Sequence, residues 1–265
     1  MIAGYARWVL RQGAGEPLVL LHGIISGERV WRRVMPQLAA HHEVIAPTAL
    51  GHNGGRLPAV RPARIEHVVE DTERLLDDLG LDRPHLAGNS MGGWVALELA
   101  RRGRARTVCA LSPAGAWQAG AGGKRRGGVL RAAVRDSRRS RAVLPLLVRS
   151  PRFRHWALRY TAAHGERVSG GELVDSADDA IGCAVYEDLL DSGESLAPLD
   201  PPPCPITLAW CGQDRIFPVD VYGARARELV PGARFIVLDD VGHVPMFDDP
   251  KLVAETILAV TLART

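Results

Sequence analysis

The residue with the clearest chemical potential is Ser90, which lies in the sequence Gly-Asn-Ser-Met-Gly-Gly at 88–93. The apolar run His85–Ala87 precedes it, and the helical pattern WVALELARR follows it. A serine in a tight turn between a strand and a helix takes strained backbone angles, and glycines on both sides remove the clashes that larger side chains would make. Such a turn places the hydroxyl at the carboxyl edge of the sheet, beside the first N–H groups of the helix. Ser90 is therefore the candidate nucleophile.

A serine hydroxyl needs a base that removes its proton and an acid that orients this base. His243 follows the last strand-like run of the chain, and Asp214 follows the run before it. Both are expected at carboxyl ends of strands, on the same edge as Ser90. The acid could instead follow the run Thr107–Leu111, but residues 112–123 contain no Asp or Glu. We therefore predict a catalytic triad in which Asp214 holds the tautomer of the His243 imidazole.

An acyl-transfer site also needs two N–H donors for the oxyanion that develops on the substrate. Met91 is expected to supply one, because it follows the nucleophile at the start of a helix. The other is expected from the loop after Leu18–Leu21, where Gly23 permits close approach and Ile24 is the candidate donor. His22 of the same loop is expected to orient it rather than to transfer protons. This chemistry requires no metal and no organic cofactor.

The elements that must position these residues alternate along the chain. Short apolar runs typical of buried strands are Leu18–Leu21, Val44–Ala46, His85–Ala87, Thr107–Leu111, Ile206–Cys211 and Phe235–Leu238. Helical patterns lie at about 29–39, 64–79, 91–102, 218–229 and 250–263. This alternation predicts an α/β fold with a mostly parallel sheet between two layers of helices. The first residues, Tyr5–Leu10, are expected to add an antiparallel edge strand.

One segment, from 115 to 198, breaks the alternation. It has no strand-like run, and it is bounded by the sequence AGAGGKRRGG and by five prolines between 198 and 205. Glycine-rich and proline-rich boundaries of this kind predict a helical cap that is inserted into a core formed by 1–114 and 199–265. The cap is expected to select the substrate. Apolar candidates for the cap side of the pocket are Trp117, Leu144, Leu147, Trp156 and Val185.

The composition narrows the class of protein. The 265 residues are 46% hydrophobic and 24% charged, which excludes a disordered chain, and no apolar run is long enough to span a bilayer. The four cysteines form no CxxC pair and the start shows no secretory leader, so reduced thiols and a cytoplasmic location are expected.

The charge distribution is uneven along the predicted cap. Twelve Lys and Arg lie between 121 and 160, and ten acids lie between 161 and 200. These blocks nearly cancel, which argues against a nucleic-acid partner and leaves a small-molecule substrate as the expected partner. The basic segment either recognises an anionic substrate such as a coenzyme A thioester or forms a solvated surface partly paired with the acids.

With these residues placed, the chain resembles the α/β-hydrolase superfamily over nearly its whole length. The resemblance rests on LHG at 21–23 followed by Trp31, GNSMGG at 88–93, GQDRIFP at 212–218 and GHVPMFDDP at 242–250. It implies an α/β-hydrolase fold, with an eight-stranded, mostly parallel sheet and a helical cap after the sixth strand. One position departs from the pattern. Many relatives carry an aspartate where this chain has Thr48, which bears on loop packing more than on catalysis.

The resemblance favours a carboxylic ester hydrolase that acts on small molecules through an acyl-enzyme. Haloalkane dehalogenases and epoxide hydrolases use an aspartate where this chain has Ser90. The loop GNSMGG is similar to that of meta-cleavage-product hydrolases, which cleave carbon–carbon bonds, and it also occurs among esterases. Carbon–carbon hydrolysis and thioester hydrolysis therefore remain alternatives. A ligand-binding receptor built on the same fold is a further alternative.

Overall fold

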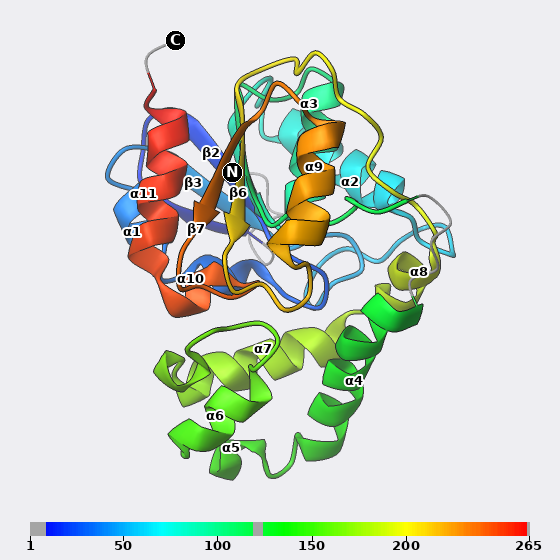
Figure 1. Ribbon diagram of the computed structural model, residues 1–265, viewed down its shortest axis with the longest axis vertical. Helices are drawn as coiled ribbons and strands as arrows, with labels where there is room; N and C mark the ends of the chain where they lie inside the picture. Colours follow the sequence, from blue (N-terminus) through cyan, green and yellow to red (C-terminus); the bar gives the residue numbers. More distant parts are fainter. Residues whose placement is uncertain (1–8, 119–123, 264–265) are drawn as a thin grey trace.

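A seven-stranded sheet forms the centre of the molecule (Figure 1). The computed structural model describes residues 9–118 and 124–263. The strands are β1 (Val9–Gln12), β2 (Pro17–Leu21), β3 (Glu43–Pro47), β4 (His85–Asn89), β5 (Thr107–Leu111), β6 (Ile206–Cys211) and β7 (Arg234–Leu238). Their order in the sheet is β1-β3-β2-β4-β5-β6-β7, and every neighbouring pair is parallel except β1 with β3. The predicted α/β class and parallel sheet are confirmed.

All six predicted runs are strands, because short, fully apolar segments have no better place than a sheet covered on both faces. The sheet has seven strands within the described residues rather than the eight expected, since no other described segment pairs with the outer edge of β1. The predicted edge strand Tyr5–Leu10 lies mostly outside the described residues. Its last two residues open β1, which is antiparallel as predicted.

Helices cover both faces of the sheet (Figure 1). One face carries α2 (Ile65–Asp78), α3 (Met91–Arg101) and α9 (Ala224–Leu229), and the other carries α1 (Met35–Leu38) and α11 (Pro250–Thr261). The predicted helix at 29–39 is divided into a 3-10 turn, η1 (Glu28–Trp31), and α1, because Pro36 lacks the N–H that a continuous helix requires. The helix predicted at 218–229 begins as a π turn, η3 (Val219–Gly223). No helix in the described ranges is long and apolar enough to cross a membrane.

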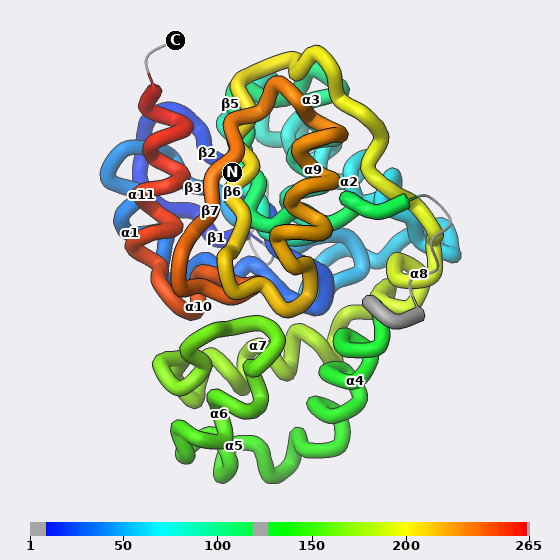
Figure 2. Tube along the Cα trace, in the orientation of Figure 1, coloured from blue at the N-terminus to red at the C-terminus, as the bar shows by residue number. Residues whose placement is uncertain are grey.

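The chain between β5 and β6 contains helices and, in its described part, no strand. The helices are α4 (Lys124–Ser140), α5 (Leu144–Leu147), α6 (Pro151–Ala157), α7 (Gly170–Gly182) and α8 (Tyr186–Asp191), with a 3-10 turn, η2 (Gly165–Arg167). We call residues 124–191 the helical insert. It lies as a layer of its own beyond the carboxyl ends of the strands, as both backbone views show (Figures 1 and 2).

Ion pairs attach α7 of the insert to the core. The Arg29 guanidinium pairs with Asp179 and, at 2.7 Å, with Asp175, and Arg32 approaches Asp175 at 2.9 Å. The Asn53 amide donates to Asp179 at 3.1 Å. Asp179 is buried, and burial raises the pKa of its carboxyl even though the Arg29 guanidinium opposes this shift. These contacts fix the position of α7 against the core, mainly against η1, which follows the loop that carries Ile24.

The basic residues of the insert pair with part of its acidic segment. Arg131 of α4 lies 2.7 Å from Glu187 and 2.8 Å from Asp191, and Arg141 donates to Asp178 at 3.0 Å. These contacts join α4 to α7 and α8 across the insert.

Candidate active site

Ser90 occupies the turn between β4 and α3 with φ +56° and ψ −116°. Its N–H donates to the Leu111 carbonyl at 3.0 Å, and its carbonyl accepts from the N–H groups of Trp94 at 3.1 Å and Ala114 at 3.0 Å. A left-handed conformation of this kind costs a non-glycine residue about 1–3 kcal/mol, and these three hydrogen bonds hold it in place. The strained turn expected from the sequence is present.

The glycines beside Ser90 are required by close backbone approach. A Cβ atom on Gly88 would lie 2.2 Å from the Gly92 carbonyl oxygen, and one on Gly92 would lie 2.1 Å from the Leu21 carbonyl oxygen. On the opposite side, a Cβ on Gly23 would lie 3.3 Å from the Cβ of Ser90. The loop after β2 thus passes directly beside the serine.

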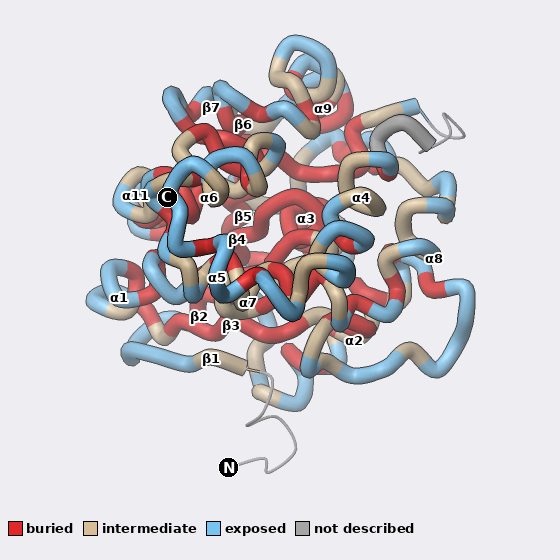
Figure 3. The backbone as a smooth tube through the Cα atoms, turned by 90° about the horizontal axis from the view of Figure 1, so that it is seen from below, coloured by how far each residue is buried: buried red, intermediate tan, exposed pale blue. Residues whose placement is uncertain are grey.

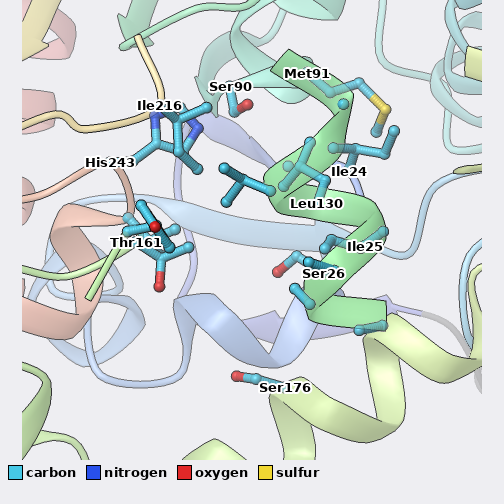
Figure 4. Close-up of a pocket in the computed structure, with 18 of the residues that line it drawn as sticks. Ile24, Ile25, Ser26, Ser90, Met91, Leu130, Thr161, Ser176, Ile216 and His243 are labelled. Carbon is cyan, nitrogen blue, oxygen red and sulfur yellow. The ribbon is translucent and has the colours of Figure 1, made fainter. Parts of the chain in front are cut away.

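His243 and Asp214 are brought together at the same edge of the sheet. The Nδ1–H of His243 donates to Oδ2 of Asp214 at 2.7 Å, since a carboxylate can only accept. Oδ1 of Asp214 accepts the N–H groups of Ile216 at 2.9 Å and Phe217 at 2.7 Å, so the carboxylate is held from both sides. Both members of the pair are buried. Nε2 of His243 is left available to Ser90, and the two side chains lie together at one end of the pocket (Figure 4).

Two side chains that the sequence analysis did not single out support His243. The Asn89 amide donates to the His243 carbonyl at 2.9 Å and to the Leu111 carbonyl at 3.2 Å, which ties the histidine loop to the sheet. The Phe217 ring meets the His243 ring edge-on, with centroids 5.0 Å apart and planes at 84°. Both residues lie inside motifs already quoted, but motif spacing does not reveal which side chain contacts the histidine.

Asp248 is a third supporting residue, and it joins the histidine loop to the insert. Its Oδ2 accepts the N–H groups of Gly242 at 2.7 Å and Ala163 at 2.9 Å, and its Oδ1 accepts that of His164 at 2.7 Å. On the other side of His243, the Val244 N–H donates to the Thr161 carbonyl at 2.7 Å. The backbone on both sides of the candidate base is thus linked to residues that lie between α6 and η2, directly at Val244 and through the Asp248 carboxylate at Gly242.

The two candidate oxyanion donors, Ile24 and Met91, line the same cavity as Ser90. Met91 is the first residue of α3, so its N–H has no acceptor within the helix and lies at the positive end of the helix dipole. Ile24 lies in the turn that brings Gly23 against Ser90, and the next residue, Ile25, has φ +54°. This arrangement fits an oxyanion hole.

The loop that carries Ile24 is held by a neutral histidine. His22 donates from Nδ1 to the Gly23 carbonyl at 2.8 Å and accepts the Ala49 N–H on Nε2 at 2.9 Å, so neither ring nitrogen is free for proton transfer. Complete burial lowers the pKa of His22 to about 3. Nearby, the Thr48 hydroxyl donates to Oε2 of Glu28 at 2.6 Å. The orienting role expected for His22 agrees with these contacts, and Thr48 serves loop packing.

A cavity of about 560 Å³ extends from Ser90 and His243 beneath the insert. Figure 4 shows Leu130 of α4 along one wall, Thr161 near His243, and Ser176 at the end away from Ser90. Most of the remaining lining is apolar and includes Ile24, Ile25, Trp94, Trp117, Val129, Leu144, Phe153, Trp156, Leu158, Leu173, Ile216, Phe217, Val244 and Phe247. The cavity is therefore shaped for an apolar group next to the serine.

Three of the five apolar residues predicted to face the pocket do so. Trp117, Leu144 and Trp156 line the cavity. Leu147 is instead exposed on the outside of α5, and Val185 is buried against Gly51, where a glycine Cβ would lie 2.3 Å from its methyl carbon. Helical periodicity gives an apolar face but does not say whether that face meets a cavity or another helix.

Besides His243, the charged residues among the lining are Asp136, Arg159 and Glu194. The Arg159 guanidinium lies over the rings of Trp156 and Tyr160, 4.6 Å and 4.7 Å from their centroids, and donates to the Trp156 carbonyl at 2.7 Å. Trp156 and Tyr160 are exposed, so this cation belongs to the outer part of the cavity. The wall around Ser90 is uncharged apart from the His243–Asp214 pair.

Comparison with known proteins identifies the family to which this arrangement belongs. A family model described as the alpha/beta hydrolase family matches residues 18–256. The chain belongs to the alpha/beta hydrolase family. This finding confirms the resemblance inferred from the motifs and the hydrolase class of the protein.

Individual relatives within the family differ in their reactions. The chain is 37% identical over 200 residues to epoxide hydrolase EphH of Mycobacterium tuberculosis, covering 72% of this chain and 91% of that protein. It is 42% identical over 93 residues, 34% of each chain, to 2-hydroxy-6-oxo-2,4-heptadienoate hydrolase of Pseudomonas putida. The solved structure of 2-hydroxy-6-oxo-6-phenylhexa-2,4-dienoate hydrolase from a Rhodococcus species shares the fold, with a TM-score of 0.74 at 22% identity over 94% of this chain and 92% of that one.

Proposed function

We propose that this α/β-hydrolase is a serine hydrolase that cleaves carboxylic esters of small molecules through an acyl-enzyme. The observation that carries the proposal is the buried His243–Asp214 hydrogen bond of 2.7 Å at the end of a largely apolar cavity that also contains the strained Ser90. A nucleophile, an oriented base and a desolvated acyl pocket are the parts that ester hydrolysis needs.

In the proposed mechanism, Oγ of Ser90 attacks the ester carbonyl carbon while Nε2 of His243 takes its proton. Asp214 stabilises the imidazolium that forms, and the N–H groups of Met91 and Ile24 bind the tetrahedral oxyanion. His243 then returns the proton to the leaving alcohol. A water molecule, deprotonated by His243, attacks the acyl-enzyme and releases the acid and Ser90.

We also propose that residues 115–198 form a cap on a core made of 1–114 and 199–265. Helices α4, α6 and α7 of the insert supply much of the cavity wall, so the acyl group would lie between the insert and the core. The cap would then select among substrates, while the core supplies the catalytic groups.

Carbon–carbon hydrolysis is the second candidate, because the loop GNSMGG is similar to that of meta-cleavage-product hydrolases and the Pseudomonas relative is named a 2-hydroxy-6-oxo-2,4-heptadienoate hydrolase. The name of that relative's substrate denotes a dienoate, which carries a carboxylate. A site for such a substrate should present a cation near the nucleophile. Among the described residues that line the cavity, Arg159 is the only Lys or Arg, and it lies toward the surface, which favours a neutral ester.

Epoxide opening fits this site less well despite the 37% identity to EphH. Attack of a serine hydroxyl on an epoxide carbon would give an ether, which has no carbonyl for water to attack. Turnover would then stop after one event. A carboxylate nucleophile avoids this problem by forming an ester, and this chain has a serine at that position.

A substrate panel tests the proposal. p-Nitrophenyl esters of two to twelve carbons, acyl-coenzyme A thioesters and a vinylogous diketone would be assayed with the wild type, Ser90→Ala and a matched control, Ser176→Ala, which alters another serine of the same cavity. We expect multiple turnovers of the esters, loss of activity in Ser90→Ala and near-wild-type activity in the control. Release of only one p-nitrophenol per chain would indicate a receptor, and faster diketone cleavage would indicate a carbon–carbon hydrolase.

A further inference from the structure

The outer surface of the helical insert carries a concentration of exposed apolar side chains. Ten large apolar side chains are exposed among the described residues, and five of them lie within the 18 residues from 143 to 160. We call this group the α5–α6 surface, and its members are Val143, Leu146, Leu147, Trp156 and Tyr160. Leu146 is 64% exposed and Trp156 is 55% exposed. Burying large apolar side chains stabilises a folded protein, yet these side chains stay exposed to water. A concentration of such groups on a surface indicates a binding site for another molecule or a membrane.

The two parts of this surface are held together. The Arg154 guanidinium of α6 donates to the Val148 carbonyl at 2.8 Å and to the Arg149 carbonyl at 3.3 Å, which joins α6 to the end of α5. Figure 3 views the molecule from the side of the insert and shows α5 and α6 at its outer surface, with exposed stretches on both. The exposed stretches of α5 and α6 therefore lie on the same side of the molecule.

Exposed arginines alternate along the chain with the apolar groups of the α5–α6 surface. Arg139, Arg149 and Arg152 are exposed, and none of the three has a carboxylate partner within the described residues. Between 135 and 160 there are eight arginines and one acid, Asp136. The surface thus combines exposed apolar groups with a local excess of positive charge, although the whole chain has a net charge of only +3.

We propose that the α5–α6 surface docks on an anionic lipid layer. Leucine and valine side chains enter the boundary of the acyl chains, tryptophan and tyrosine favour the level of the headgroups, and arginines bind lipid phosphates. This surface has all three kinds of residue. It would contact the layer from one side, and no helix among the described residues is long and apolar enough to cross a membrane.

The charge pattern disfavours a second copy of the chain as the occupant. A symmetric dimer would bring the same patch of both protomers together, so that the excess arginines of both copies would lie in one interface. Repulsion between these like charges would oppose the gain from burying the apolar groups. An anionic lipid layer matches both parts of the pattern.

The α5–α6 surface is continuous with the candidate active site. Trp156 and Tyr160 belong to this surface and also line the cavity that contains Ser90. A docked molecule would therefore hold the outer part of its cavity against the lipid layer, where an amphiphilic ester could pass into it. This last step rests on the proposed ester hydrolysis, whereas docking itself does not.

Sedimentation with vesicles tests the docking. The wild type would be mixed with vesicles of phosphatidylcholine alone or with phosphatidylglycerol, at low and high salt. We expect binding to the anionic vesicles that decreases with salt, and little binding to phosphatidylcholine. Arg149→Gln with Arg152→Gln should weaken binding about thirtyfold, and Val143→Ser with Leu146→Ser about tenfold.

Matched controls lie on the core. Leu57→Ser with Val60→Ser removes a leucine and a valine that are each somewhat more exposed than their counterparts Leu146 and Val143, and Arg234→Gln with Lys251→Gln removes the same charge. Both controls should bind vesicles like the wild type, and thermal melting would show that every variant is folded. No binding of the wild type to anionic vesicles, or equal losses in the controls, would overturn the proposal. A concentration-dependent dimer that Leu146→Ser abolishes, without vesicle binding, would identify a second copy as the occupant and also overturn it.

Discussion

Asp248 offers the sharpest test of how the candidate base is held. Its carboxylate accepts three N–H groups, from Gly242, Ala163 and His164, and its side chain is 5% exposed. Asn at this position keeps one acceptor oxygen and turns an NH₂ group toward a remaining N–H donor. A hydrogen bond to a charged group contributes about 1.5–3 kcal/mol, so losing one or two of the three should lower the free energy of unfolding by about 1.5–6 kcal/mol.

Asp248→Asn should also lower the catalytic rate. Because Gly242 precedes His243, a looser loop would misplace Nε2, and we expect kcat for a p-nitrophenyl ester to fall about 100-fold with a smaller change in KM. The control is Asp249→Asn. This exposed neighbour accepts the Leu252 N–H at 2.9 Å as the N-cap of α11. Because Asn caps a helix about as well as Asp, the substitution should lower the free energy of unfolding by less than about 0.5 kcal/mol and leave kcat unchanged. Urea unfolding and steady-state kinetics would measure both effects. Equal stability and equal kcat in the two variants would refute this account of Asp248.

Three further predictions follow from the site. Asp214→Asn should lower kcat about 10⁴-fold by favouring the wrong tautomer of His243, and retention of most activity in steady-state assays would place the acid elsewhere. Burial lowers the pKa of His22 to about 3 and that of His52 to about 4, so the unfolded state binds more protons than the native state below the ordinary histidine pKa of about 6.5. Stability should therefore be lost as the pH falls from about 6.5 toward these values, by about 2 kcal/mol per histidine at pH 5, and His52→Gln should show a shallower loss in urea unfolding. Ser176→Phe fills the end of the cavity away from Ser90 and should lower kcat/KM for twelve-carbon esters about 10- to 100-fold relative to two-carbon esters, and an unchanged ratio would show that the acyl chain lies elsewhere.

Much of the core could be predicted because its strands are short and buried on both faces. β5 and β6 begin and end at the predicted residues, since every position in them is buried and the apolar run stops where the strand does. A helix end that is marked by a glycine could also be predicted. Gly80, with φ +68°, ends α2 as its N–H donates to the Asp77 carbonyl at 2.9 Å and the Leu81 N–H donates to the Leu76 carbonyl at 2.8 Å.

The supporting residues of the site could not be predicted in the same way. Asn89 acts on a carbonyl 154 positions away, and Asp248 on N–H groups 84 and 85 positions away. Such hydrogen bonds depend on how the insert packs against the histidine loop. This packing produces no periodic pattern of apolar residues from which it could be predicted. The motif GHVPMFDDP contains two adjacent aspartates. The sequence alone does not indicate that Asp248 is buried and that Asp249 is the exposed N-cap of a helix.

The contacts between α7 and the core limit how the insert can be exchanged between proteins. Asp179 is buried against Arg29, and a Cβ on Gly27 would lie 2.9 Å from its Oδ2. If residues 124–191 were grafted onto another scaffold, Asp179 would become a buried carboxylate without its cation, at a cost of about 3–5 kcal/mol. A recombinant enzyme that inherits this insert must therefore also inherit Gly27 and Arg29 from a part of the gene more than ninety codons upstream. Shuffling libraries that cross over between these two regions should yield folded chimaeras only when both come from the same parent.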